Sequence, residues 1–279
     1  MRSAAFALLM LAATLSACSR APEGQAPPVG LTIVSLNPCS DAVLAEVADP
    51  GQVLALSHYS SDPSSSSMDV DVARRFPSVS GSVEEVMALK PDVVVTGTFV
   101  APAMADAFHR LGVRLEKVPI ATSVAESKAQ VTQLAALAGH PERGAMLNRR
   151  IDAALAEAAP PATSEPASAV VWQSGGIVPG RNTLIADLLR RTGFASLSAA
   201  RGMGQAELLP LEVMLADPPQ VILAAGNPQA DEDRMLGHPA LRALAHTRHE
   251  RFDPSLLWCG GPTLIRSAQR LAEIRRAIS

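Results

Sequence analysis

Two cysteines are the residues of this sequence best suited to covalent or metal chemistry. Cys39 and Cys259 are the pair that remains once the N-terminal Cys18 is set aside. In an oxidising compartment outside the cytoplasm, such an isolated pair forms a disulfide more often than it remains two thiols. We therefore expect a disulfide between Cys39 and Cys259, which would tie the beginning of the folded chain to its end.

Two other chemistries stay open for the same cysteines. As thiolates, Cys39 and Cys259 could together bind a soft metal such as copper in an envelope protein. Cys39 could alternatively be the nucleophile of an exported α/β hydrolase, with His58 as its base. The sequence contains neither a Gly-x-Ser-x-Gly nucleophile elbow nor a Gly-x-x-x-x-Gly-Lys phosphate loop, which argues against familiar enzyme classes.

A second set of residues is suited to holding a ligand. Aromatic residues make up only 3% of the sequence, and a flat aromatic face suits a bulky, largely apolar ring system. In α/β proteins, ligands meet the loops that follow the carboxyl ends of strands. Applied to the strands given below, that rule predicts these ligand-binding residues: Asn37, Ser40, His58, Tyr59, Ser82, Phe99, Trp172, Gln173, Asn227 and Trp258.

Some of these residues also have an ordinary structural explanation. His58 could ligate the iron or cobalt of a chelate, but a loop histidine can equally be solvated. Trp172 and Trp258 could pack in the core instead of facing a ligand. Tyr59 lies in a predicted exposed loop, which favours the binding interpretation.

The elements that must position these residues are organised around a repeat. Residues Glu84 to Val95 recur as Glu212 to Leu223, 128 positions later and without a gap. Each copy is typical of a short helix, a proline stop and a buried strand. A single repeat at this distance indicates two similar lobes, since solenoid repeats recur every ~20–50 residues. Chance likeness between two common helix–proline–strand units is the alternative.

The remaining chain alternates strands and helices, which predicts parallel sheets in an α/β fold. Ser40 is the expected N-cap of the first helix, and a helical stretch over 123–158 is interrupted only at Gly139-His140-Pro141. The expected strands are 31–36, 53–56, 93–95, 113–118, 169–172, 221–223 and 250–252.

The N-terminus predicts export and a lipid anchor. Residues 1–17 have the pattern of a signal peptide, because the apolar run from Ala4 to Leu15 is too short to span a bilayer of ~30 Å. Leu15-Ser16-Ala17-Cys18 matches the bacterial lipobox, so Cys18 would carry the lipid and residues 18–30 would form a proline-rich linker. Cleavage of an ordinary signal near Ala17 or Ala21 is the alternative. The net charge of −3 indicates that nucleic acid is not a partner.

Together these features resemble the class III periplasmic substrate-binding proteins of ABC importers, which serve vitamin B12, haem and ferric siderophores. The resemblance spans about residues 31 to 278. It rests on residues 33–36, on 83–94 and their copy, and on Gly237-His238-Pro239-Ala240-Leu241. It implies two α/β lobes with parallel-type sheets and a ligand cleft between them: an N-terminal lobe (31–120), a long helical connection (121–160) and a C-terminal lobe (167–279).

The resemblance also implies partners. Glu84 and Glu212, one in each lobe, would lie on the outer surface and pair with arginines of a membrane permease, which works with ATPase subunits. A solvated first-turn glutamate, favoured by the helix dipole, is the alternative explanation for each. The chain would then be a periplasmic, membrane-anchored lipoprotein rather than an enzyme, with no catalytic residue, no metal site of its own and no permanently bound cofactor. A ligand-free structural lipoprotein is disfavoured by the repeat.

For the ligand we expect a cobalt or iron chelate. We rank cobalamin or another corrinoid first, a ferric siderophore second and haem third. Siderophores and haem propionates are anionic, whereas the expected cleft loops are poor in Arg and Lys, with Arg181 and Arg201 as exceptions.

Overall fold

The computed structural model of the chain describes residues 30–226 and 237–278. The predicted signal peptide, the lipidation at Cys18, nearly all of the linker and the ligand-binding prediction for Asn227 lie outside the described residues.

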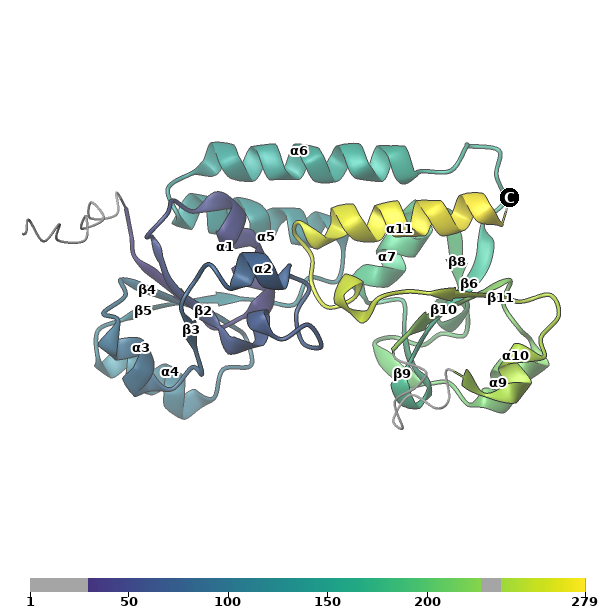
Figure 1. Cartoon of the computed structure of the whole chain (residues 1–279), viewed down its shortest axis with the longest axis horizontal. Helices are drawn as coiled ribbons and strands as arrows, with labels where there is room; N and C mark the ends of the chain where they lie inside the picture. The colour runs from purple at the N-terminus through teal and green to yellow at the C-terminus, as the bar shows by residue number, and fades with distance from the viewer. Residues whose placement is uncertain (1–29, 227–236, 279) are drawn as a thin grey trace, which may run out of the picture.

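The first lobe is built on a five-stranded parallel sheet (Figure 1). Its strand order is β3-β2-β1-β4-β5. The strands are β1 (Ile33–Ser35), β2 (Val53–Ser57), β3 (Ser78–Val79), β4 (Val93–Gly97) and β5 (Arg114–Val118).

Helices cover both faces of this sheet because its central strands bury side chains on both sides. Ile33 and Val93 belong to the apolar layer shared with α1 (Pro38–Val47). Their neighbours Val34 and Val94 belong to a second layer with Val86 and Phe108, which come from α3 (Val83–Ala88) and α4 (Pro102–Arg110). The short elements η1 (His58–Ser61) and α2 (Val70–Ala73) follow β2.

The second lobe repeats this plan with a four-stranded parallel sheet in the order β11-β10-β6-β8. Its strands are β6 (Ala167–Gln173), β8 (Phe194–Ser196), β10 (Val221–Ala225) and β11 (Arg248–Arg251). A separate antiparallel pair joins β7 (Ile177–Pro179) to β9 (Ala206–Leu208). The helical elements are η2 (Ser174–Gly176), α7 (Leu184–Arg191), α8 (Leu197–Ala200), α9 (Leu211–Ala216), α10 (Pro239–Arg242), η4 (Pro254–Leu256) and α11 (Thr263–Ala277).

The sequence repeat marks equivalent units of the two lobes. Adding 128 to the bounds of α3 and β4 gives the bounds of α9 and β10 at every end. β4 lies beside β1 in the first sheet, and β10 lies beside β6 in the second. The prediction of two similar lobes from a gapless repeat is therefore confirmed.

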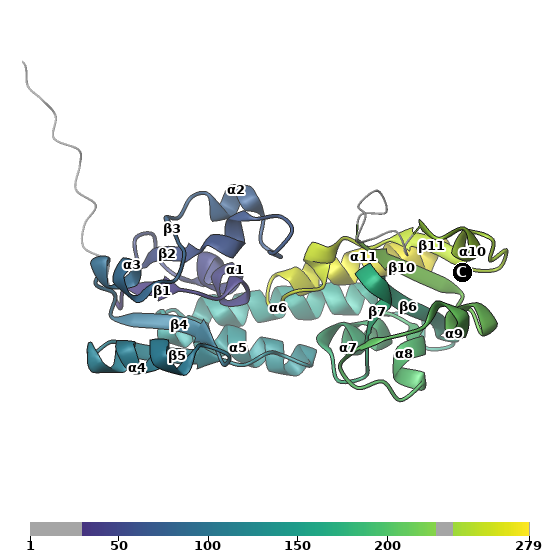
Figure 2. The same ribbon diagram turned by 90° about the horizontal axis from the view of Figure 1, so that it is seen from below.

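The connection between the lobes consists of two helices, α5 (Val124–Leu137) and α6 (Pro141–Ala158). Gly139 has a positive φ of 82°, which ends α5 and favours glycine. α6 packs against α5 and, further along, against α11, as the views in Figure 1 and Figure 2 both show. It therefore spans both lobes. Within the described residues, no helix is long and apolar enough to cross a membrane.

Two local predictions were wrong. The N-cap of α1 is Asn37 rather than Ser40: the Asn37 Oδ1 accepts hydrogen bonds from the backbone N–H groups of Cys39 (2.9 Å) and Ser40 (3.4 Å). Pro38 then takes the first helical position, where its missing N–H costs nothing. The list of expected strands also omits β7 and β9, two short strands that pair with each other.

The close contact between α5 and α6 depends on a glycine, and this can be tested. A Cβ at Gly144 of α6 would lie 2.5 Å from the Ala135 Cβ and 3.2 Å from the Val131 carbonyl oxygen of α5. We expect Gly144→Ala to lower the free energy of unfolding by about 1–2 kcal/mol, because overpacking costs more than the gain in helix propensity. Urea denaturation measures this. The control Ala145→Met, on the exposed face of α6, should change stability by less than about 0.5 kcal/mol; equal effects would contradict the packing argument.

Candidate functional site

A cleft between the lobes is the candidate ligand site. It has two adjoining parts that share Asn37, Val118 and Ile120. The part on the first lobe has a volume of about 440 Å³, and the part that touches both lobes has about 420 Å³. Each is within the range of ~300–1,000 Å³ typical of ligand pockets.

Strand ends place the residues that line this cleft. Asn37 follows β1, Phe99 follows β4, Ile120 follows β5 and Gln173 ends β6. In parallel sheets these carboxyl ends lie on one edge, and here the edges of the two lobes face the same cleft. The location agrees with the rule that ligands bind beyond the carboxyl ends of the strands.

The described lining of the cleft is polar but uncharged. Among the described residues that line its two parts, none is acidic or basic. Its polar side chains are five carboxamides, Asn37, Gln130, Gln173, Asn182 and Gln205, and the hydroxyls of Ser80, Thr96, Thr98, Thr122 and Thr183. Its apolar character comes from exposed Phe99 (84%), Ile120 (70%), Tyr59 (49%) and Trp258 (49%). Such a surface can stack on a large apolar ring and exchange hydrogen bonds with neutral polar groups around its edge.

Five of the predicted ligand-binding residues line the cleft: Asn37, Tyr59, Phe99, Gln173 and Trp258. The structure brings them together from loops far apart in the sequence. Tyr59 and Phe99 line the part on the first lobe, Gln173 and Trp258 the part between the lobes, and Asn37 both.

Four predicted residues lie elsewhere. Trp172 is 0% exposed in the apolar layer that β6 shares with α9 in the second lobe, and Ser40, in the first turn of α1, is 1% exposed, so neither side chain reaches the cleft surface. The predictions of ligand contact for these two are corrected on that ground. Ser82 caps α3 by accepting the Glu85 N–H at 3.2 Å. His58 is exposed and packs its ring against Tyr59 at 4.0 Å, without lining the cleft.

Sequence reasoning missed several lining residues. Ile120 and Thr122 follow the predicted strand β5, so the strand-end rule applied there would have found them. Gln130 lies inside α5, and Gln205 precedes the unpredicted β9. No local pattern marks these two, because only the packing of the lobes brings them to the cleft.

The position of Tyr59 depends on a buried carboxylate. Asp41 of α1 is 0% exposed. Its Oδ2 accepts hydrogen bonds from the Ser57 N–H at 3.0 Å and from the Ser60 Oγ at 2.6 Å, the two residues that flank His58 and Tyr59. Burial raises the pKa of Asp41 to about 7, although hydrogen bonds from Ser35, Ser60 and Ser57 act in the opposite direction.

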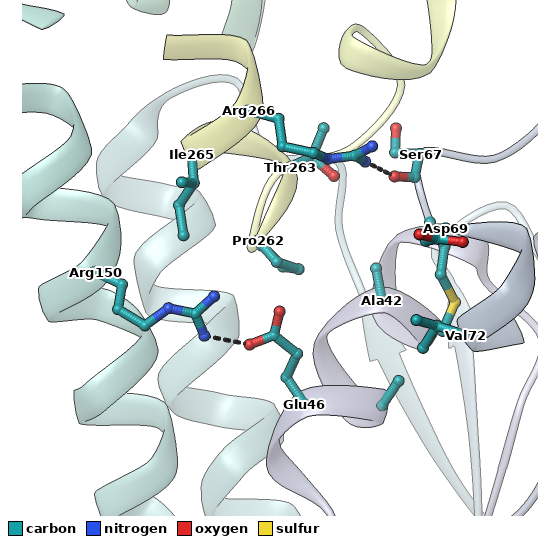
Figure 3. Close-up of a pocket in the computed structure, with 12 residues that line it drawn as sticks. Ala42, Glu46, Ser67, Asp69, Val72, Arg150, Pro262, Thr263, Ile265 and Arg266 are labelled. Atoms are coloured by element: carbon teal, nitrogen blue, oxygen red, sulfur yellow. Dashed lines mark hydrogen bonds and ion pairs between the residues drawn. The ribbon is translucent and has the colours of Figure 1, made fainter. Parts of the chain in front are cut away.

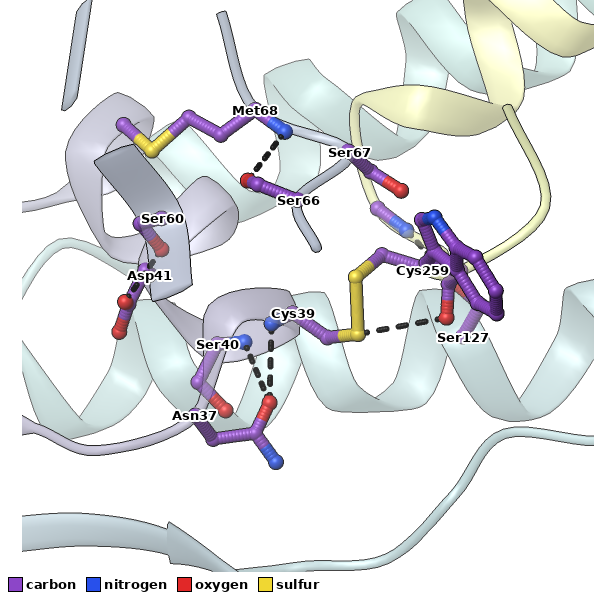
Figure 4. The surroundings of a disulfide bond; sticks show 12 residues. Asn37, Cys39, Ser40, Asp41, Ser60, Ser66, Ser67, Met68, Ser127 and Cys259 are labelled. Atoms are coloured by element: carbon purple, nitrogen blue, oxygen red, sulfur yellow. Dashed lines mark hydrogen bonds between the residues drawn. A yellow bond between two sulfur atoms is a disulfide. The ribbon is translucent and has the colours of Figure 1, made fainter. Parts of the chain in front are cut away.

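Cys39 and Cys259 form a disulfide at the edge of the cleft, as the sequence predicts (Figure 4). Their sulfur atoms are 2.13 Å apart and their Cα atoms 5.0 Å apart. In this bonded state neither sulfur is a thiolate, so the structure offers neither a Cys39 nucleophile nor a paired soft-metal site. Within residues 30–226 and 237–278, no group of three or more His, Cys, Asp or Glu side chains is placed to hold a metal ion.

A smaller pocket of about 220 Å³ lies between α1, α6 and α11 (Figure 3). Charged groups hold its walls together. Arg150 pairs with Glu46 at 2.5 Å, and Arg266 donates a hydrogen bond to the Ser67 carbonyl oxygen. The pocket is too small for a bulky chelate, and its bonds join α11 and α6 to the first lobe.

The outer charged residues are placed as follows. Glu84 and Glu212 are exposed on α3 and α9, at equivalent positions of the two lobes. In Figure 1 both helices lie on the side of the molecule opposite α6. Arg201 pairs with Asp217 at 2.8 Å, and neither Arg201 nor Arg181 lines the cleft.

The two α/β lobes, the helical connection and the cleft between them define a two-lobed ligand-binding protein. Residues 33–252 match the periplasmic binding protein family, and the chain belongs to that family.

Solved structures show the same fold. The periplasmic haem-binding protein RhuT of Roseiflexus sp. RS-1 has a TM-score of 0.67 at 21% identity, covering 89% of this chain and 98% of its own. The vitamin B12-binding protein BtuF of Vibrio cholerae has a TM-score of 0.69 at 16% identity, covering 90% and 99%. The haem-binding protein HutB of Vibrio cholerae has a TM-score of 0.71 at 15% identity, covering 88% and 98%. No curated protein matches the sequence significantly.

The buried Asp41 makes stability depend on pH. Its pKa is about 7 in the folded protein against an ordinary 3.8, so between these values the folded state holds the proton more tightly. Its stabilising contribution is present below about pH 4 and is lost as pH rises through about 7. A tenfold change in proton affinity corresponds to about 1.4 kcal/mol. We therefore expect the free energy of unfolding of the wild type, taken relative to that of Asp41→Asn, to fall by on the order of 4 kcal/mol between pH 4 and pH 8.

Urea denaturation at successive pH values measures this difference. The matched control is Asp71→Asn, at an exposed carboxylate, which should follow the wild-type pH dependence. Parallel curves for wild type and Asp41→Asn would show that Asp41 does not titrate in this range.

Proposed function

We propose that this chain is the substrate-binding component of an ABC importer, which captures a bulky metal chelate in the periplasm and delivers it to a membrane permease. A corrinoid such as cobalamin is the favoured ligand, followed by a ferric siderophore and then haem. The observation that carries this order is that the described residues lining the cleft are uncharged and include carboxamides on both lobes.

The charge argument separates the ligands. Haem propionates and anionic siderophores need cationic partners, since a carboxylate moved from water into a cleft without one loses its solvation. A corrinoid is nearly neutral and carries amide groups around a flat macrocycle. Asn37, Gln173 and Gln205 can exchange hydrogen bonds with such amides, while Tyr59 and Trp258 pack against the apolar faces.

Haem is the ligand against which cobalamin must be tested. Two of the structural neighbours described above are named as haem-binding proteins and one as a vitamin B12-binding protein. The Tyr59 phenol lines the cleft beside the His58 ring, and both side chains are able to ligate iron. None of the described lining residues is cationic, so the propionates would find no charged partner among them, which favours the corrinoid.

Delivery to the permease falls to Glu84 and Glu212. Their exposure at equivalent positions of α3 and α9 supports docking on a two-fold symmetric permease, where arginines would pair with both carboxylates. The lipid at Cys18 would keep the protein at the membrane, close to its partner.

The ligand is tested by titrating the protein with cyanocobalamin, haem and a ferric siderophore while following tryptophan fluorescence. We expect cyanocobalamin to bind at least tenfold more tightly than haem. Tyr59→Ala should weaken cyanocobalamin binding about tenfold or more, because it removes an aromatic wall of the cleft. Met146→Ala, at an exposed apolar residue on α6 away from the cleft, is the control and should bind as the wild type does. Tighter haem binding would reverse the ligand order, and no response to any chelate would remove the ligand claim.

Docking is tested separately from binding. We expect Glu84→Ala/Glu212→Ala to keep wild-type affinity for cyanocobalamin, since neither side chain lines the cleft, and to abolish transport by cells that depend on this importer. Glu142→Ala/Glu157→Ala, at two exposed glutamates of α6, is the matched control and should transport normally. Normal transport by the first variant would assign the two carboxylates to the solvated surface.

A further inference from the structure

The segment Leu257–Pro262, here called the Trp258 loop, belongs to the second lobe in sequence but lies against the first. It follows β11 and η4 of the second lobe and leads into α11. In Figure 1 the chain crosses to the junction of the lobes before α11 returns along α6. The loop therefore joins the lobes at the edge of the cleft.

Two bonds fix the loop, one to α1 of the first lobe and one to α5 of the helical connection. The disulfide links Cys259 to Cys39, the second residue of α1. The Gly261 N–H donates a buried 2.7 Å hydrogen bond to the Ser127 Oγ of α5. Beside the disulfide, the Cys39 Sγ lies 3.4 Å from the Trp258 carbonyl oxygen, so the backbone of Trp258 contacts the bonded sulfur.

The contact between loop and helices leaves no space for side chains. A Cβ at Gly260 would clash with the Ser127 Oγ, and one at Gly261 would lie 2.7 Å from the Val43 Cγ2. Gly261 also has a positive φ of 58°, which favours glycine. The loop is thus held at van der Waals distance from α1 and α5.

Trp258 is the large side chain that this arrangement presents to the cleft. It is 49% exposed and lines the part between the lobes together with Cys39 and Gly260. Cys259, its neighbour in the chain, is 3% exposed. The indole therefore depends for its position on a backbone anchored one residue away.

We propose that the Cys39–Cys259 disulfide is a positioning element of the cleft, which holds the Trp258 indole at the ligand-facing wall so that ligand affinity depends on the bond. The effect of the disulfide on ligand affinity rests on the proposed function, whereas its effect on the position of the Trp258 indole does not. Cys39 and Cys259 are then positioning residues that act on the ligand through Trp258.

The position of Trp258 can be measured without a ligand. The chain has two tryptophans, and Trp172 is fully buried, so acrylamide quenching reports mainly on Trp258; Trp258→Phe protein supplies the Trp172 background. We expect the quenching constant of Trp258 to change at least twofold in Cys39→Ser/Cys259→Ser. An unchanged constant overturns the proposal, whether or not any ligand binds.

Affinity is measured with cyanocobalamin as the probe. We expect Cys39→Ser/Cys259→Ser to weaken binding about tenfold in the wild-type background and less than twofold in the Trp258→Phe background, because the bond acts through that indole. Equal weakening in both backgrounds overturns the proposal. Failure of the wild type to bind cyanocobalamin would refute the proposed ligand, while the quenching comparison would still decide the role of the disulfide.

Two controls separate positioning from general loosening. Val86→Ala creates a cavity in the outer layer of the first lobe and should leave quenching unchanged; a change equal to that of the cysteine variant overturns the proposal.

If the cysteine variant does not fold, dithiothreitol reduction of folded wild type replaces it. The reagent's two thiols supply two electrons and two protons, which convert the protein disulfide to two thiols while the reagent closes its own disulfide. Quenching unchanged after complete reduction overturns the proposal equally.

Discussion

One apolar layer runs without interruption through both lobes, and the rest of the structure depends on it. α6 buries Leu147, Ile151 and Leu155 in this layer, which continues from β1 of the first lobe to α11 of the second. Burying each such side chain contributes roughly 1.5–3 kcal/mol. Neither lobe alone covers the full stripe of α6, so the helix sets the separation of the lobes and turns their strand ends toward one cleft.

The same layer explains why the described residues that line the cleft can lack charge. The lobes are held together by buried apolar side chains and by bonds outside the cleft, such as Arg150 with Glu46 and the Val124 N–H with Asp187. No ion pair across the cleft mouth is then needed to keep the lobes in place. The lining residues are free to be carboxamides, which donate and accept hydrogen bonds at a smaller desolvation cost than charged groups.

The sequence predicts the helices and strands of the two lobes better than it predicts the residues that line the cleft. The gapless repeat marks α3, β4 and their copies because helix periodicity, a proline stop and an apolar run are local signals. The strand-end rule finds Tyr59, Phe99 and Trp258 but fails at Trp172. Side chains alternate along β6, so Val170 and Trp172 share the layer that packs under α8 and α9. Gln130 and Gln205 reach the cleft only through tertiary packing, which no local pattern contains.

The first turn of α1 contributes both to the fold and to the lining of the cleft. Asn37 caps the helix and lines the cleft, Cys39 anchors the Trp258 loop, and Asp41 bonds the two ends of the turn that carries Tyr59. Both aromatic side chains are therefore positioned from one helix start, Tyr59 in the part of the cleft on the first lobe and Trp258 in the part that touches both lobes. The backbone segments that carry Tyr59 and Trp258 are thus each held by bonds to this helix. Loops anchored in this way lose less conformational entropy on binding than mobile loops do, so a ligand held between them would retain more of its contact energy as affinity.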